Sequence, residues 1–170
     1  MARVKKLKES SALPGKPSGL AMSDLEQTLG YLLSMAQQYV FRDFQASFDA
    51  LELTPNLYSV LVLIDANPGC RQTDIGSALG VLQTNLVERI DILVTRGLVR
   101  RVEHEIDRRA KALTLTLNGK IFMGTVRQTH DEMIAALVRS FGESEHAQLL
   151  ALLQKLIACE QSSEERGAAR

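Results

Sequence analysis

The chain has 170 residues, of which 45% are apolar and 24% are charged. This composition supports one compact domain, or a small domain with an oligomerisation element, and excludes a chain that is disordered throughout. The 20 Lys and Arg residues equal the 20 Asp and Glu residues, so the formal net charge is zero. Only the placement of the charges can therefore indicate a charged partner.

The cysteines and the apolar runs exclude several classes of protein. Cys70 and Cys159 are too few for a disulfide framework and lack the spacing of a zinc site. The longest unbroken apolar stretch, residues 133–138, is far too short to span a bilayer. The basic first residues run into Ser, Pro and Gly, so no signal peptide is predicted. We expect a cytoplasmic protein with no membrane partner, no metal and no cofactor.

A long helix is predicted after a basic, Pro- and Gly-rich stretch over residues 1–19. We expect that stretch to be a flexible arm, either a solvated tail or a counter-charge for phosphates. Ser23 and Glu26 have the spacing of a capping box. Apolar residues then recur at helical intervals to about Ala50, on several faces, so this helix needs more than one covering neighbour.

Three shorter helices are predicted next along the chain. Thr54 and Pro55 start a helix, because Thr caps it and Pro fits the first helical position. Short helices are predicted over residues 71–79 and 83–96, separated by Gly80. The second of these places three residues on its inner side: Leu86, Ile90 and Leu93.

The periodicity then changes from helix to strand. Residues 98–104 and 110–115 are typical of two short extended segments around a charged tip at residues 105–109. Thr116 caps a further helix, and a leucine-rich helix follows over residues 144–160. We therefore predict a mainly α (α+β) fold, a winged helix-turn-helix flanked by long N- and C-terminal helices. Its helix fits the major groove of DNA and its hairpin tip fits the minor groove.

The hairpin carries a specific motif. The run Asp107-Arg108-Arg109-Ala110, followed by Leu115-Thr116 and Gly119, resembles the wing signature of the MarR family of transcriptional regulators. Residues 97–101 and 53–55 also resemble stretches of that family, and the resemblance extends from Ser23 to about Glu160. It implies a homodimer, held by the first and last helices, that presents two winged domains to a palindromic operator in double-stranded DNA. On the residues alone, the leucine stripe of the last helix could equally pack within one chain.

The resulting domain organisation has four parts. Residues 1–19 form the arm, residues 20–52 and 117–161 the helical dimerisation region, residues 53–116 the DNA-binding domain, and residues 162–170 a frayed tail.

The wing supplies the first group of candidate DNA-binding residues. The resemblance implies that Arg109 enters the minor groove, where A-tracts attract arginine, and that Asp107 orients it by an ion pair. Arg108 is expected to contact a phosphate or the groove wall. Arg101 is a candidate phosphate contact on the first wing strand.

The predicted recognition helix supplies the second group. Gln83, Thr84 and Asn85 lie at its start, where side chains reach base edges. Glu88 departs from the family, which commonly has Arg or another polar donor at this position. It either accepts from cytosine N4 or repels phosphate and lowers affinity, and the sequence leaves both alternatives open.

The resemblance also implies a cleft for small lipophilic or aromatic effectors, between the dimer helices and the DNA-binding domain. Five residues could line it: Tyr39, Arg42, Tyr58, Met123 and His130. Such a set suits an aromatic carboxylate or its acyl-CoA thioester, although core packing explains most of these side chains equally well.

We therefore predict a ligand-responsive repressor that is released from its operator when effector changes the separation of its recognition helices. An enzyme is disfavoured because the sequence contains no Gly-rich phosphate loop, nucleophile elbow or HExxH motif. The alternative is a winged-helix protein–protein interaction module without sequence-specific DNA binding, which Glu88 and the zero net charge keep open.

Overall fold

The structure is a computed structural model that describes residues 22–103 and 111–168. The chain divides into two units at Val40 and Phe41. In the first unit the structure shows a short 3-10 helix, η1 (Leu25–Gln27), and the first part of α1 (Leu29–Phe48).

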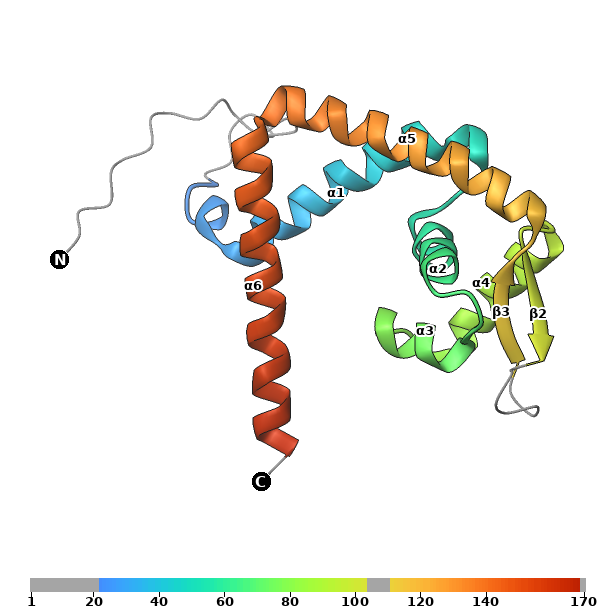
Figure 1. Cartoon of the computed structure of the whole chain (residues 1–170). Helices are drawn as coiled ribbons and strands as arrows, with labels where there is room; N and C mark the ends of the chain where they lie inside the picture. Colours follow the sequence, from blue (N-terminus) through green and yellow to red (C-terminus); the bar gives the residue numbers. More distant parts are fainter. Residues whose placement is uncertain (1–21, 104–110, 169–170) are drawn as a thin grey trace. The chain divides into compact units, whose positions relative to one another are not determined.

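The second unit contains the rest of α1 and all the remaining elements (Figure 1). In chain order these are η2 (Asp49–Leu51), α2 (Pro55–Ala66), β1 (Cys70–Arg71), α3 (Gln72–Leu79), α4 (Gln83–Thr95), β2 (Val99–Glu103), β3 (Lys111–Leu115), α5 (Leu117–Phe141) and α6 (Glu143–Ala168). No helix among the described residues has the length and apolarity needed to cross a membrane.

The first helix differs from its prediction at the N-terminal end. The residue before η1 is Asp24, which makes no side-chain cap, so the capping box predicted at Ser23 is not the start of the long helix. Thr28 is extended, with ψ of 131°, and its hydroxyl donates to the carbonyl of Leu25 at 2.8 Å. Such a local side-chain bond competes with the helical backbone, so α1 begins only at Leu29.

The last helix is longer than its prediction. α6 continues past Glu160 to Ala168, where the sequence predicts a frayed tail. The tail is polar, but Glu and Arg sustain a helix about as well as apolar residues do. Lack of an apolar stripe was therefore a poor signal for the end of this helix.

Two caps predicted from threonine are confirmed. The hydroxyl of Thr54 accepts from the backbone N–H of Leu57 at 3.3 Å, with Pro55 at the first helical position of α2. The hydroxyl of Thr116 accepts from the N–H of Gly119 at 2.9 Å and starts α5. Each cap satisfies a backbone donor that has no partner within the helix.

The sheet has three strands rather than the two predicted, in the order β1-β3-β2. β2 and β3 form the antiparallel hairpin, with Val99 opposite Leu115 and Glu103 opposite Lys111. β1 adds two residues to the other edge of β3, and Cys70 pairs with Leu113. A strand of two residues carries no periodicity, so the sequence could not reveal it.

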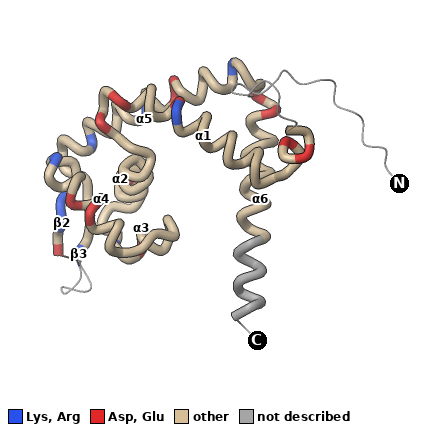
Figure 2. Tube along the Cα trace, turned by 180° about the vertical axis from the view of Figure 1, so that it is seen from behind, with Lys and Arg blue, Asp and Glu red and all other residues tan. Residues whose placement is uncertain are grey.

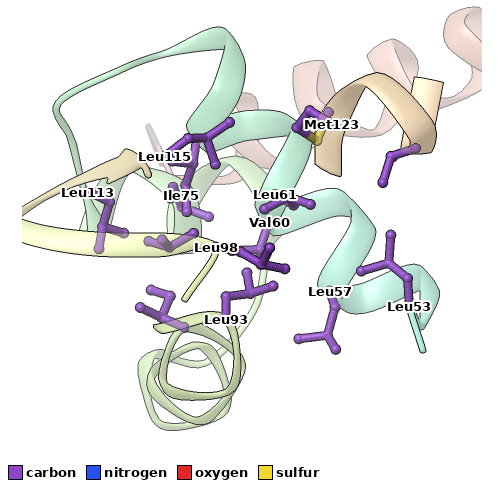
Figure 3. Close-up of a cluster of buried hydrophobic side chains, with 14 of the residues drawn as sticks. Leu53, Leu57, Val60, Leu61, Ile75, Leu93, Leu98, Leu113, Leu115 and Met123 are labelled. Atoms are coloured by element: carbon purple, nitrogen blue, oxygen red, sulfur yellow. The ribbon is translucent and has the colours of Figure 1, made fainter. Parts of the chain in front are cut away.

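One core joins helices α2, α3 and α4 to the sheet and to α5 (Figure 3). Val60 and Leu61 of α2 meet Leu93 of α4 and Leu113 of β3, and each of these side chains is at most 1% exposed. Each such side chain contributes about 1.5–3 kcal/mol when fully buried. This core fixes which face each helix turns outward.

Gly119 explains how closely α5 approaches the sheet. A Cβ atom at this position would overlap the backbone carbonyl oxygen of Leu98. The hydroxyl of Thr116 also donates to the carbonyl of Gly97 at 2.6 Å, which ties the same junction. The glycine of the wing signature is thus required by a backbone approach.

Candidate nucleic-acid interface

The orientation of α4 follows from its apolar stripe. Leu86, Ile90 and Leu93 are fully buried against the core. With 3.6 residues per turn, the opposite side of the helix faces solvent. Thr84, Asn85 and Glu88, which the sequence places on that side, are exposed as predicted. Whether they contact DNA remains a prediction.

The turn between α3 and α4 depends on two glycines, Gly76 within α3 and Gly80 at its C-terminal end. Gly80 has a φ of +60° and ends α3 in the left-handed conformation that glycine adopts without strain. Gly76 is buried, and a Cβ atom there would overlap the carboxamide of Gln83. Gln83 is exposed like Thr84 and Asn85, as predicted, and its carboxamide lies against Gly76 of α3.

A shallow groove of about 470 Å³ runs along the exposed side of α4. The groove is lined by Thr84, Val87, Glu88, Asp91, Ile92, Thr95 and Arg96. Val87 and Ile92 expose 39% and 41% of their surface there. This side of α4 is thus partly apolar and carries two carboxylates.

The wing strands are described up to Glu103 and from Lys111 onward. The tip between them, with Asp107, Arg108 and Arg109, lies outside the described residues. The hairpin beneath the predicted tip is confirmed by the β2–β3 register.

Arg101 of β2 pairs with Asp91 of α4. Its guanidinium donates to the carboxylate of Asp91 on α4 at 2.6 Å, and the two side chains are 32% and 55% exposed. In Figure 2, basic positions of β2 lie beside acidic positions of α4. Arg101, predicted as a phosphate contact, here holds the wing strand against α4.

Arg96 is a second arginine that links separate elements, a role that no sequence pattern predicts. It forms the C-cap of α4 and donates to the carbonyls of Leu51 and Glu52, both at 2.9 Å. Its guanidinium carbon also lies 5.4 Å from the ring centroid of Phe122 on α5. One side chain thus joins the end of α4 to η2 and α5.

Aromatic rings of α1, α2 and α5 form a cluster around Tyr58 of α2. The rings of Tyr58 and His130 stack with centroids 5.6 Å apart. Phe44 and Phe48 of α1 both meet Tyr58 edge to face. Burial, and secondarily the charge of Asp131, raise the pKa of Tyr58. These contacts bring together two of the predicted effector residues.

The other predicted effector residues are placed differently. Met123 is only 2% exposed and belongs to the core. Arg42 is exposed on α1 in the second unit. Tyr39 is half-buried and belongs to the first unit.

The surroundings of Cys70 are not those of a reactive cysteine. Cys70 is half-buried, and desolvation raises the pKa of its thiol, so the reactive thiolate is disfavoured. Within residues 22–103 and 111–168, no three His, Cys, Asp or Glu side chains cluster as metal ligands.

Helices α3 and α4 beside the β2–β3 hairpin define a winged-helix protein of the DNA-binding class. Residues 53–111 match the model of the MarR family. The structure of the transcriptional repressor CouR bound to a 23-mer DNA duplex is similar, with 37% identity and a TM-score of 0.79. It covers 82% of this chain and 99% of the CouR chain. The chain belongs to the MarR family of transcriptional regulators.

Other relatives agree with this assignment. CouR bound to p-coumaroyl-CoA is 35% identical with a TM-score of 0.74, over 81% of this chain and 97% of its own. The proposed transcriptional regulatory protein for the hcr operon of Thauera aromatica is 28% identical over 148 residues, which are 84% of this chain and 89% of that protein. Members of the family are DNA-binding regulators and not enzymes, so this chain is a transcriptional regulator without catalytic activity.

Proposed function

We propose that the chain is a homodimeric repressor that binds a palindromic operator and is released by an aromatic effector. The exposed polar start of α4, mounted beside the wing on one core, is the observation that carries the proposal. A helix with this exposure fits the major groove and reads base edges through its first turns. The similarity to CouR in complex with a DNA duplex supports the same use of this surface.

Exposed apolar side chains support dimerisation. In the first unit Leu29 is 58% exposed, and in the second Leu152 and Ile157 of α6 are 65% and 59% exposed. Such surfaces on terminal helices favour association with a second copy. We assign residues 20–52 and 117–161 to the dimer interface and residues 53–116 to DNA binding. A twofold axis would then present two α4 helices to half-sites about one helical turn, or 34–36 Å, apart.

The wing completes the proposed contact with DNA. Arg109 enters the minor groove, Asp107 orients it, and Arg108 contacts the adjoining backbone. A mobility-shift assay on the promoter region of the chain's own gene tests this contact. Binding should be lost in Arg109→Ala and should fall steeply with salt. Arg166→Ala, which removes the same charge from α6 outside the proposed dimer interface and DNA-binding domain, should bind as the unmodified protein does. Equal binding by both variants would contradict the role of the wing, and absence of all binding would favour the protein–protein module.

The aromatic cluster around Tyr58 is the proposed effector site. Stacked and edge-to-face rings bind planar aromatic groups, and His130 adds a polar partner on the ring of Tyr58. Arg42 is the proposed cationic partner for a carboxylate or thioester. The structure of CouR bound to p-coumaroyl-CoA supports this ligand class. Effector would shift the dimer toward a separation of the α4 helices that no longer fits the operator.

Titration of the operator complex with p-coumaroyl-CoA, p-coumarate and coenzyme A tests this site. The acyl-CoA or the free acid should release DNA while the dimer stays intact in size-exclusion chromatography. Tyr58→Leu should lose the response and keep operator binding, whereas Tyr58→Phe should retain both. Dissociation of the dimer, or an unchanged response in Tyr58→Leu, would contradict the proposed site.

A further inference from the structure

Glu88 is an exposed carboxylate on the side of α4 that faces away from the core. It lies one helical turn beyond Thr84 and Asn85, so the three residues share one face. Val87, next to it, adds exposed methyl groups to the same groove. Any duplex that contacts the start of α4 therefore also meets the carboxylate of Glu88.

The two carboxylates of this groove differ in their partners. Asp91 is neutralised by Arg101 at 2.6 Å. For Glu88, the structure shows no ion pair or hydrogen bond to any residue that it describes. Arg96, the basic residue among those that line the groove, is occupied by the carbonyls of Leu51 and Glu52. Among the residues that the structure describes, Glu88 thus has no cationic partner that would neutralise its carboxylate.

The chemistry of the groove restricts what such an acceptor can bind. An ionised carboxylate only accepts hydrogen bonds. In the major groove guanine presents O6 and N7 and thymine presents O4, which are all acceptors. Adenine places its N6 donor beside the N7 acceptor, whereas cytosine presents the N4 amino group. Cytosine is therefore the base edge that a carboxylate fits without opposing an acceptor of the same base.

The surroundings of Glu88 favour base contact over a purely repulsive role. A surface that tracks the phosphate backbone is rich in Lys and Arg, but Glu88 lies between the apolar Val87 and Ile92. Apolar side chains contact the methyl groups of thymine on the floor of the groove. This composition suits a helix face that is directed at base edges.

We propose that Glu88 specifies a cytosine in each operator half-site by accepting a hydrogen bond from its N4 amino group. This inference rests on the proposed function, because it assumes that α4 enters the major groove. It assigns to Glu88 a role in base discrimination that a merely repulsive carboxylate would not have.

Selection from a pool of duplexes, randomised over about 25 base pairs to accommodate two half-sites one turn apart, tests the inference. The unmodified protein should select a motif with a fixed cytosine in each half. Glu88→Gln should select adenine at that one position, because Gln pairs bidentately with adenine, and leave the other positions unchanged. Replacing the cytosine by thymine should weaken binding of the unmodified protein at least about fivefold and that of Glu88→Gln far less.

Glu165→Gln is the matched control, since it removes the same charge from α6 outside the proposed dimer interface and DNA-binding domain, and it should select the same motif as the unmodified protein. If Glu88→Gln selects that motif too, with only higher affinity for every sequence, Glu88 acts by repulsion and the inference is wrong while the proposed function stands. If the unmodified protein selects no motif at all, both the inference and the proposed function are wrong.

Discussion

The contacts of Arg96 predict that this residue stabilises the fold well beyond an ordinary surface arginine. It makes two hydrogen bonds of 2.9 Å to backbone carbonyls and lies over the ring of Phe122. Hydrogen bonds to a charged group contribute about 1.5–3 kcal/mol each when buried, and partial exposure reduces this to about 1 kcal/mol each. The cation–π contact adds about 0.5–1 kcal/mol. Arg96→Met, which keeps the aliphatic stem, should therefore lower the free energy of unfolding by about 2–3 kcal/mol.

Urea unfolding followed by far-ultraviolet circular dichroism measures this loss. The subunit concentration must be the same for all variants, because the proposed dimerisation would contribute to the apparent stability. Arg96→Lys keeps the charge but not the planar fork, so its loss should be about 1 kcal/mol, the value of one hydrogen bond. Arg100→Met is the control, since Arg100 is exposed on β2, and it should change stability by less than about 0.5 kcal/mol. Equal losses in Arg96→Met and Arg100→Met would refute the reasoning.

Three further predictions concern local structure. Gly119→Ala should destabilise the protein by about 1–3 kcal/mol in thermal unfolding, because its Cβ would overlap the carbonyl oxygen of Leu98; an unchanged transition temperature would show that α5 can move away. The N–H of Arg71 donates to Asp74 and lowers the pKa of this carboxyl. The stabilising effect of this hydrogen bond is present above the unfolded pKa of about 3.9 and is lost as the pH falls through the folded pKa. Asp74→Asn should therefore be less stable than the unmodified protein at neutral pH and equally stable in strong acid. A stability difference that is the same at both pH values would contradict this linkage. In Cys159→Ser, the raised pKa of Cys70 should make alkylation by iodoacetamide at pH 8 slower than that of glutathione; a faster reaction would contradict the burial of the thiol.

The parts of the fold that depend on local patterns could be predicted from the sequence. The stripe of Leu86, Ile90 and Leu93 gave the buried side of α4, and the threonines at positions 54 and 116 gave two helix starts. Each of these signals lies within one turn or one short element. Periodicity and capping report on such distances directly.

The parts that depend on tertiary contacts could not be predicted. Arg96 meets carbonyls 44 and 45 residues away, and Arg101 meets Asp91 across the turn between α4 and β2. Nothing near an arginine in the sequence distinguishes a side chain that binds backbone from one that contacts phosphate. The packing of Gln83 on Gly76 has the same cause, because the close approach of α3 and α4 becomes apparent only in three dimensions.

The zero net charge is compatible with DNA binding because the ion pairs divide the charges into two groups. Asp91, Asp65 and Asp74 are each paired with an arginine on or beside their own element, so these pairs add little to the field around the protein. The arginines of these three pairs are already neutralised by carboxylates, so they are not available to neutralise phosphates. Counterion release depends on the number of phosphates neutralised and not on the sum of charges. The electrostatic part of the proposed operator binding would therefore depend on cations outside these pairs, of which Arg100 and Lys111 lie exposed on the wing strands.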